Sequence, residues 1–126
     1  MNENKLSKII IGAAIEAHRE LGGPGLLEDI YEEAMCHELK LQKVPVGRQL
    51  HYPVMYKNVK LARPLILDVL VGDLVIVESK AVDEIHPVHK AQLLTYLRIT
   101  GKKLGLLINF GEETVAKGIH RAVNGL

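Results

Sequence analysis

The chain has 126 residues, of which 48% are hydrophobic and 25% charged, with 16 lysines and arginines against 15 aspartates and glutamates. This length and composition predict one domain, spanning residues 1–126, with a core of its own. The near-balance of charge excludes a strongly basic nucleic-acid binder, so any such contact must come from local patches. The single cysteine, Cys36, cannot form an intrachain disulfide, which fits a reducing cytoplasm. No stretch approaches the length of a membrane span.

Two helices are predicted in the first third of the chain. Residues 4–21 carry apolar side chains at helical spacing, and Gly22-Gly23-Pro24-Gly25 ends that helix and starts another, which runs to about Leu41. Residues 49–56 alternate loosely between apolar and polar, which predicts a strand, and Pro53 indicates that it lies at a sheet edge or contains a bulge. Residues 57–60 are predicted to form a turn.

The rest of the chain alternates between apolar strands and helices. Residues 65–71 and 74–77 are apolar strands, Pro87 begins a helix that ends near Thr100, and residues 104–110 form a strand of the kind buried on both faces. A last helix is predicted from about Glu112 onward, because its acids come first and His120 and Arg121 lie in its final turns. Its apolar inner face is formed by Val115, Ala116, Ile119, Ala122 and Val123. The predicted class is α/β, a mixed sheet with helices packed against it.

Three charged residues lie in or directly after these apolar strands. Asp68 stands in the middle of the first strand, and the second ends in Glu78-Ser79-Lys80. A buried carboxylate that is neither paired nor bound to a metal costs several kcal/mol or more, so these charges need partners. The spacing is what a β-hairpin needs to bring two acids and a lysine together at a divalent-cation site.

The loop of this hairpin decides whether Asp68 and Glu78 meet. A two-residue loop at Gly72-Asp73 would turn Glu78 to the side opposite from Asp68. A three-residue loop over residues 71–73, or a bulge, would put both acids and Lys80 on one face. The competing interpretation is that Glu78 and Lys80 mark the solvated end of a strand, while Asp68 pairs with an arginine.

Four other polar residues are candidates for the same site. Glu28 falls at the third position of the second helix if Gly25 caps it, a place that the helix dipole alone favours, and Tyr31 follows on the same face. Gln92 and Tyr96 are four residues apart on the helix after the second strand. They either form an ordinary boundary between core and solvent or border the site, where Gln92 would order a water or a phosphate oxygen.

The segment Gly25-Leu26-Leu27-Glu28-Asp29-Ile30-Tyr31 resembles the signature that names the GxxExxY protein family. The resemblance continues in order through Asp68, residues 78–82, residues 91–97 and residues 105–111, and covers nearly the whole chain from Ile10 onward. That family is assigned to the PD-(D/E)XK nuclease superfamily, which has a restriction-endonuclease-like α-β-β-β-α-β core. The resemblance implies that residues 1–126 form a single domain of this kind, with an extra N-terminal helix and a C-terminal helix. The residue before Asp68 is leucine, where the superfamily's nominal motif has proline.

The resemblance also implies the roles of the site residues. Asp68 and Glu78 would hold a metal ion, and hard carboxylate oxygens select Mg²⁺ or Mn²⁺. The ion would activate a water and orient the scissile phosphate. Lys80 would hold or deprotonate that water, or stabilise the transition-state charge. The implied catalytic set is Lys80, Glu78, Asp68, Glu28 and Gln92. From their positions on the helices beside Glu28 and Gln92, Tyr31 and Tyr96 are predicted to bind the substrate.

The leading hypothesis is a metal-dependent nuclease that hydrolyses phosphodiester bonds of DNA or RNA, and a homodimer would fit two sites acting on two strands. The alternative is a non-catalytic module that retains the nuclease fold and binds nucleic acid or a protein. Small size and near-zero net charge favour the alternative. The intact set of three energetically costly charges favours the nuclease.

Overall fold

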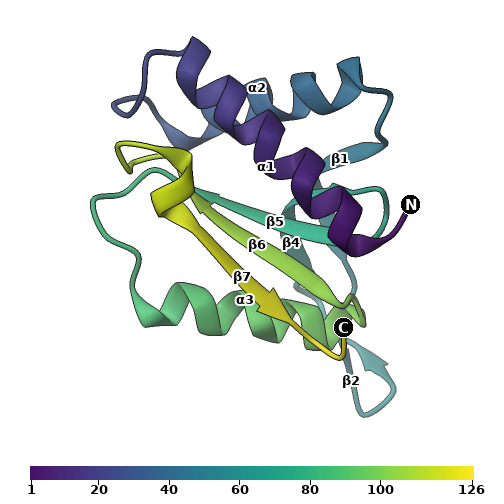
Figure 1. Ribbon diagram of the computed structural model, residues 1–126. Helices are drawn as coiled ribbons and strands as arrows, with labels where there is room; N and C mark the ends of the chain where they lie inside the picture. The colour runs from purple at the N-terminus through teal and green to yellow at the C-terminus, as the bar shows by residue number, and fades with distance from the viewer.

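The computed structural model describes residues 1–126 as three layers, with a five-stranded mixed sheet between two helices on one face and one helix on the other (Figure 1). The helices are α1 (Glu3–Glu20), α2 (Glu28–Leu41) and α3 (Pro87–Thr100), with a 3₁₀ turn η1 (Val115–Gly118). The strands are β1 (Val46–Tyr52), β2 (Met55–Tyr56), β3 (Val59–Lys60), β4 (Leu65–Val71), β5 (Val75–Lys80), β6 (Leu104–Asn109) and β7 (Ile119–Val123). No helix is both long and apolar enough to cross a bilayer.

The sheet has the order β1-β4-β5-β6-β7. Only β5 and β6 are parallel, and α3 is the crossover that a parallel pair requires. The larger core, of 19 buried residues, brings α1 and α2 together with strand residues such as Val69 and Val77. A smaller core joins the sheet to α3 and consists of Leu67, Ile76, Leu93, Leu97 and Leu107. Every residue of β6 is buried, which confirms the prediction for this strand.

The three predicted helices before residue 101 are confirmed. The Asn2 side chain caps α1 by accepting a hydrogen bond from the Lys5 N–H at 2.9 Å, and Gly101 ends α3 at φ +74°. The start of α2 differs from the prediction. Leu27 is its N-cap, so Glu28 is the first helical residue and not the third.

The predicted C-terminal helix is wrong. Only the 3₁₀ turn η1 is helical there, and the chain then continues as β7, which pairs antiparallel with β6. Without β7, the buried strand β6 would leave a row of backbone groups unpaired. Gly118 allows this docking, because a Cβ atom there would lie 2.3 Å from the Asn109 carbonyl oxygen. The apolar positions that predicted a helix belong to two different elements.

The predicted strand over residues 49–56 ends earlier, at Tyr52, because the following Pro53 has no N–H to continue the ladder. The predicted turn after it is the centre of a small separate hairpin, β2–β3. Lys57 and Asn58 form its tip at φ +47° and +67°, as a two-residue hairpin turn requires. This β2–β3 hairpin extends away from the body of the molecule (Figure 1).

The close approach at Gly111 gives a test of the packing. A Cβ atom there would lie 2.3 Å from the Val82 carbonyl oxygen. We therefore expect Gly111→Ala to lower the free energy of unfolding by roughly 1–3 kcal/mol in a urea titration. Gly12→Ala is the matched control, since nothing lies within 4 Å of that site on α1 and alanine should there raise stability by up to about 1 kcal/mol. Equal effects of the two substitutions would contradict the structure.

Candidate functional site

The loop between β4 and β5 has three residues. Val71 pairs with Val75, so Gly72, Asp73 and Leu74 form the loop, with the first two at φ +59° and +58°. This loop lies one residue later than the three-residue loop considered from the sequence, and it excludes the two-residue alternative. Because the loop has three residues, each even-numbered residue of β4 pairs with an even-numbered residue of β5. The side chains of such a pair share one face of the sheet.

Asp68 and Glu78 therefore come opposite each other. Val69 pairs with Val77, and the same register continued by one residue places Asp68 against Glu78. The backbone pairing of the two strands ends at this point. In its place, the Ser79 N–H donates a hydrogen bond to Asp68 Oδ2 at 3.2 Å.

The pairing on the other side of Asp68 is interrupted as well. β1 pairs with β4 on both sides of Gln49, but not at Gln49 itself, whose backbone is left-handed at φ +50°. A non-glycine residue in this region is uncommon and costs free energy, so the surrounding structure must hold it there. The Asp68 carboxylate thus lies where the ladders on both sides of β4 are broken.

Glu78 is a half-buried acid with one carboxylate oxygen that no hydrogen-bond donor reaches. Its Oε1 atom is shielded from solvent and has no hydrogen-bond partner. Burial and, next, the nearby Asp68 carboxylate together raise the pKa of Glu78 to about 9, and the Lys80 ammonium partly opposes this rise. An acceptor of this kind is stabilised by binding a proton or a cation.

These side chains line one open, polar pocket of about 570 Å³, with walls formed by α2, β1, β4, β5 and α3. The lining residues are Glu28, Asp29, Glu32, Arg48, Gln49, Ile66, Asp68, Glu78, Lys80, Gln92 and Tyr96. Six of the seven residues expected at the site from the sequence are among them. The structure therefore brings the two strand acids, the lysine, the first acid of α2 and the polar pair of α3 together.

Glu28 and Gln92 reach the pocket from opposite sides of the sheet. Partial desolvation raises the pKa of the exposed Glu28 carboxyl, the Lys80 ammonium lowers it and Asp68 raises it, so these three charges interact across the pocket. On α3, Gln92 Nε2 donates a hydrogen bond to Tyr96 Oη at 2.7 Å. That bond fixes the amide so that its carbonyl oxygen remains free to accept.

Tyr31 does not belong to the pocket, contrary to the expectation from its place one turn after Glu28. Its side chain is completely buried, and its ring stacks on Phe110 with centroids 5.0 Å apart. Its hydroxyl donates to the Gly23 carbonyl oxygen at 2.7 Å and accepts from the Leu26 N–H at 3.0 Å. Tyr31 holds the loop before α2 in place and is not among the residues that line the pocket.

Sequence reasoning missed a buried ion pair in the pocket wall. Glu32 is only 2% exposed, and its Oε1 accepts from Arg48 Nε at 3.1 Å and from Gln49 Nε2 at 3.2 Å. Burial raises the pKa of Glu32, and these two hydrogen bonds lower it. Glu32 follows Glu28 by one helical turn, a spacing that could have revealed it. The bond from Gln49 could not have been predicted, because it depends on the left-handed backbone of β1.

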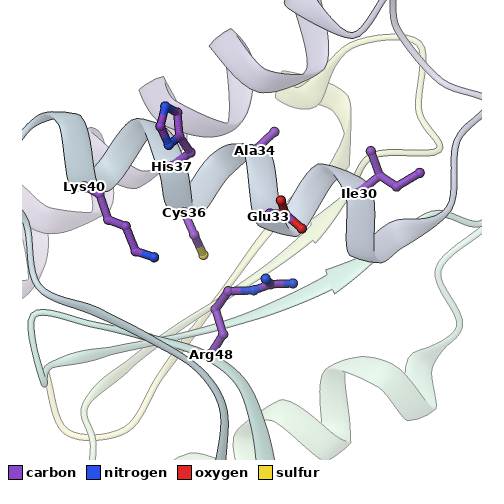
Figure 2. A pocket seen from close by; sticks show the side chains of 7 residues that line it. All are labelled: Ile30, Glu33, Ala34, Cys36, His37, Lys40 and Arg48. Atoms are coloured by element: carbon purple, nitrogen blue, oxygen red, sulfur yellow. The ribbon is translucent and has the colours of Figure 1, made fainter.

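A second pocket, of about 580 Å³, lies beside the first and shares Arg48 with it (Figure 2). Figure 2 shows the Arg48 side chain extending from β1 toward α2, where Cys36 and Lys40 also line the cavity. Burial raises the pKa of the Cys36 thiol to about 11, so it is not a thiolate nucleophile at neutral pH. This pocket holds neither the strand acids nor Lys80.

The chemistry of the donors in the first pocket fits a hard divalent cation. No group of three or more histidine, cysteine, aspartate or glutamate side chains is arranged to hold an ion through protein ligands alone. Mg²⁺, however, is usually bound by one or two carboxylates and completes its shell with water and phosphate. Asp68 and Glu78, with the unpartnered Glu78 Oε1, supply such a pair.

Comparison with known families agrees with the fold and the pocket. A family model described as the PD-(D/E)XK nuclease superfamily matches residues 4–122. The chain therefore belongs to this superfamily, whose nucleases generally use divalent metals. Searches among curated proteins and among solved structures each found no significant match.

The raised pKa of the half-buried Glu78 predicts how stability depends on pH in the metal-free protein. Its pKa rises from an ordinary 4.5 to about 9 on folding, so between these values the folded state binds more protons than the unfolded state. The free energy of unfolding should then fall as pH rises across this window, by up to about 1 kcal/mol per pH unit. Glu78→Gln should flatten this dependence in urea titrations with a chelator present.

Glu113→Gln is the control for that measurement. Its side chain is 82% exposed and lies outside the pocket, so removing its charge should leave the pH dependence unchanged. If Glu78→Gln and the parent protein show the same slope, Glu78 does not bind a proton on folding between these pH values.

Proposed function

We propose that this chain is a metal-dependent phosphodiesterase that hydrolyses DNA or RNA. The observation that carries the proposal is the convergence of Asp68, Glu78 and Lys80 in one polar pocket, with a Glu78 oxygen that no protein group satisfies. The three charges would be an energetic burden in a purely structural domain. Superfamily membership over residues 4–122 supports the same reaction class.

Each residue has a defined part in this proposal. Asp68 and Glu78 would hold the cation, which when bound supplies positive charge against the scissile phosphate and lowers the pKa of a bound water. Lys80 carries three N–H donors and no acceptor as an ammonium ion, so it holds the attacking water or a non-bridging phosphate oxygen. Gln92, fixed by Tyr96, orients a water or a phosphate oxygen through its free carbonyl or amide group.

The finer assignments rest on the sequence signature and on the pocket. We assign the chain to the GxxExxY family within the superfamily, on the segment from Gly25 to Tyr31. Carboxylate donors favour Mg²⁺ or Mn²⁺ as the ion. The single, buried Cys36 is consistent with action in the reducing cytoplasm. A homodimer would place two such pockets on two strands of a substrate.

Removal of the lysine tests the mechanism directly. We expect Lys80→Ala to lower the rate of Mg²⁺- or Mn²⁺-dependent cleavage at least about 100-fold, because the ammonium is the only basic side chain among the three converging charges. Cleavage is measured on a panel of labelled single- and double-stranded DNA and RNA. Lys103→Ala is the matched control. Lys103 directly precedes β6, next to the start of β5 and away from Lys80 at its end, and it lies outside the pocket. Unchanged cleavage in the folded Lys80→Ala protein would remove the proposal.

Calorimetric titration with Mg²⁺ or Mn²⁺ separates a nuclease from a binding module of the same fold. We expect one ion site that is lost in Asp68→Asn. The affinity should rise with pH by up to about tenfold per unit below pH 9, because the ion must displace the proton held by Glu78. Glu113→Gln should bind the ion as the parent chain does. Binding that is absent, or that survives Asp68→Asn, would favour the non-catalytic module.

A further inference from the structure

The basic residues of this chain are strongly segregated along the sequence. Between Glu38 and Asp68 there are six lysines and arginines and no acid. The remainder of the chain then holds 10 bases and 15 acids, so the near-zero net charge conceals one basic segment in an acidic background. The six basic residues are Lys40, Lys43, Arg48, Lys57, Lys60 and Arg63.

The fold places this segment at one border of the molecule. β1 is the edge strand of the sheet, and the β2–β3 hairpin extends beyond the point where Tyr52 pairs with Leu65. The hairpin forms a two-stranded sheet of its own and is seen clear of the body in Figure 1. We call the segment between Tyr52 and Leu65, which contains the hairpin and Arg63, the arm. The arm is narrow and has little core beneath it, so its charged side chains face solvent.

The cations of the arm are not neutralised by neighbouring acids. Lys57, Lys60 and Arg63 are exposed, and none of them takes part in an ion pair within the chain. Lys57 instead lies over the ring of Tyr56, 5.5 Å from its centroid, and Tyr56 is 59% exposed. Free cations beside an accessible aromatic ring are the combination that binds phosphates and stacks bases of single-stranded nucleic acid.

The arm is continuous with the candidate site. Gln49 of β1 faces Asp68 of β4, and both line the pocket. A strand rises about 3.3 Å per residue, so Leu65 at the base of the arm is about 10 Å along β4 from Asp68. On the other side, Arg48 of β1, paired with Glu32, and Lys40 of α2 line the neighbouring pocket (Figure 2). The cations without an acidic partner on β1 and its extension therefore lie on the hairpin side of the acidic pocket.

We propose that β1 and the β2–β3 hairpin bind a single strand of nucleic acid and lead its backbone into the pocket of Asp68 and Glu78. Lys57, Lys60 and Arg63 contact phosphates, and Tyr56 stacks on a base. The inference that the bound strand is a substrate rests on the proposed function, whereas the binding surface does not need catalysis. A duplex is less suited, because stacking on Tyr56 needs an unpaired base and the arm offers only a narrow surface.

The test measures binding without cleavage. Anisotropy of a labelled single-stranded oligonucleotide is recorded in the presence of a chelator, at several salt concentrations, for the full chain. We expect the triple substitution Lys57→Gln, Lys60→Gln and Arg63→Gln to weaken binding at least about tenfold at low salt. It should also reduce the slope of log affinity against log salt by about 2, because three phosphate contacts are lost.

A second triple variant keeps the same net charge as the first. Lys8→Gln, Lys103→Gln and Lys117→Gln remove three cations from α1, from the turn before β6 and from η1, all outside β1 and the hairpin. This control should retain the affinity and the slope of the parent chain. Equal weakening by the two variants would show that only net charge matters and would overturn the proposal.

Tyr56→Leu addresses the single strand specifically. It should weaken single-strand binding about tenfold and leave duplex binding nearly unchanged. Tighter binding of duplex than of single strands, together with no effect of Tyr56→Leu, would overturn the single-strand assignment.

The proposed phosphodiesterase activity and the proposed binding surface can be contradicted independently of each other. Binding that depends on the hairpin without any cleavage by the parent chain contradicts only the phosphodiesterase. Cleavage with hairpin-independent binding contradicts only this surface.

Discussion

The hydrogen bond from the Ser79 N–H to the Asp68 carboxylate is the interaction on which the candidate site depends. It takes the place of a backbone bond where β4 and β5 separate, and so allows a charged side chain to lie inside a sheet. The three-residue loop at Gly72 sets the register that brings Glu78 opposite. On the other side of β4, the left-handed backbone at Gln49 interrupts the ladder again. A regular sheet would have paired these backbone groups with one another and not with the Asp68 side chain.

The two acids Glu32 and Glu78 of the pocket differ in how many hydrogen bonds they accept. This difference distinguishes a residue that stabilises the pocket wall from one that is available to bind an ion. Glu32 is buried but accepts two hydrogen bonds, so it stabilises the wall and fixes Arg48 and Gln49. Glu78 is half-buried and has a solvent-shielded oxygen without a partner. Unsatisfied buried acceptors are rare in folded proteins, and they mark sites where another group is to be bound. The energetic cost of Glu78 is therefore an argument for ion binding at this position.

The acidic pocket and the basic arm have different and complementary roles toward a nucleic-acid backbone. An acidic pocket alone would repel a phosphate backbone, whereas cations along the border attract it and bring it near. The edge position of β1 makes this possible, because an edge strand has one side free and can continue into a projecting hairpin. The same edge strand carries Gln49 and Arg48 into the pocket wall. One element thus connects the interior of the site with the outer surface.

The sequence by itself determined the three helices before residue 101 and the buried strands, because these follow from local periodicity. It also singled out the three charged residues in or after the apolar strands, because burying a charge is costly. It did not determine the hairpin register, since Gly72 suits loops of either length. The last segment, from Val115 to Val123, has a period compatible with a helix, and only the unpaired edge of β6 made part of it a strand. Tyr31 likewise has a helical position that suits a pocket, but Phe110 stacks on it in the core. Pairing, register and the surroundings of a polar side chain depend on residues far apart in the chain, and only their packing decided these points.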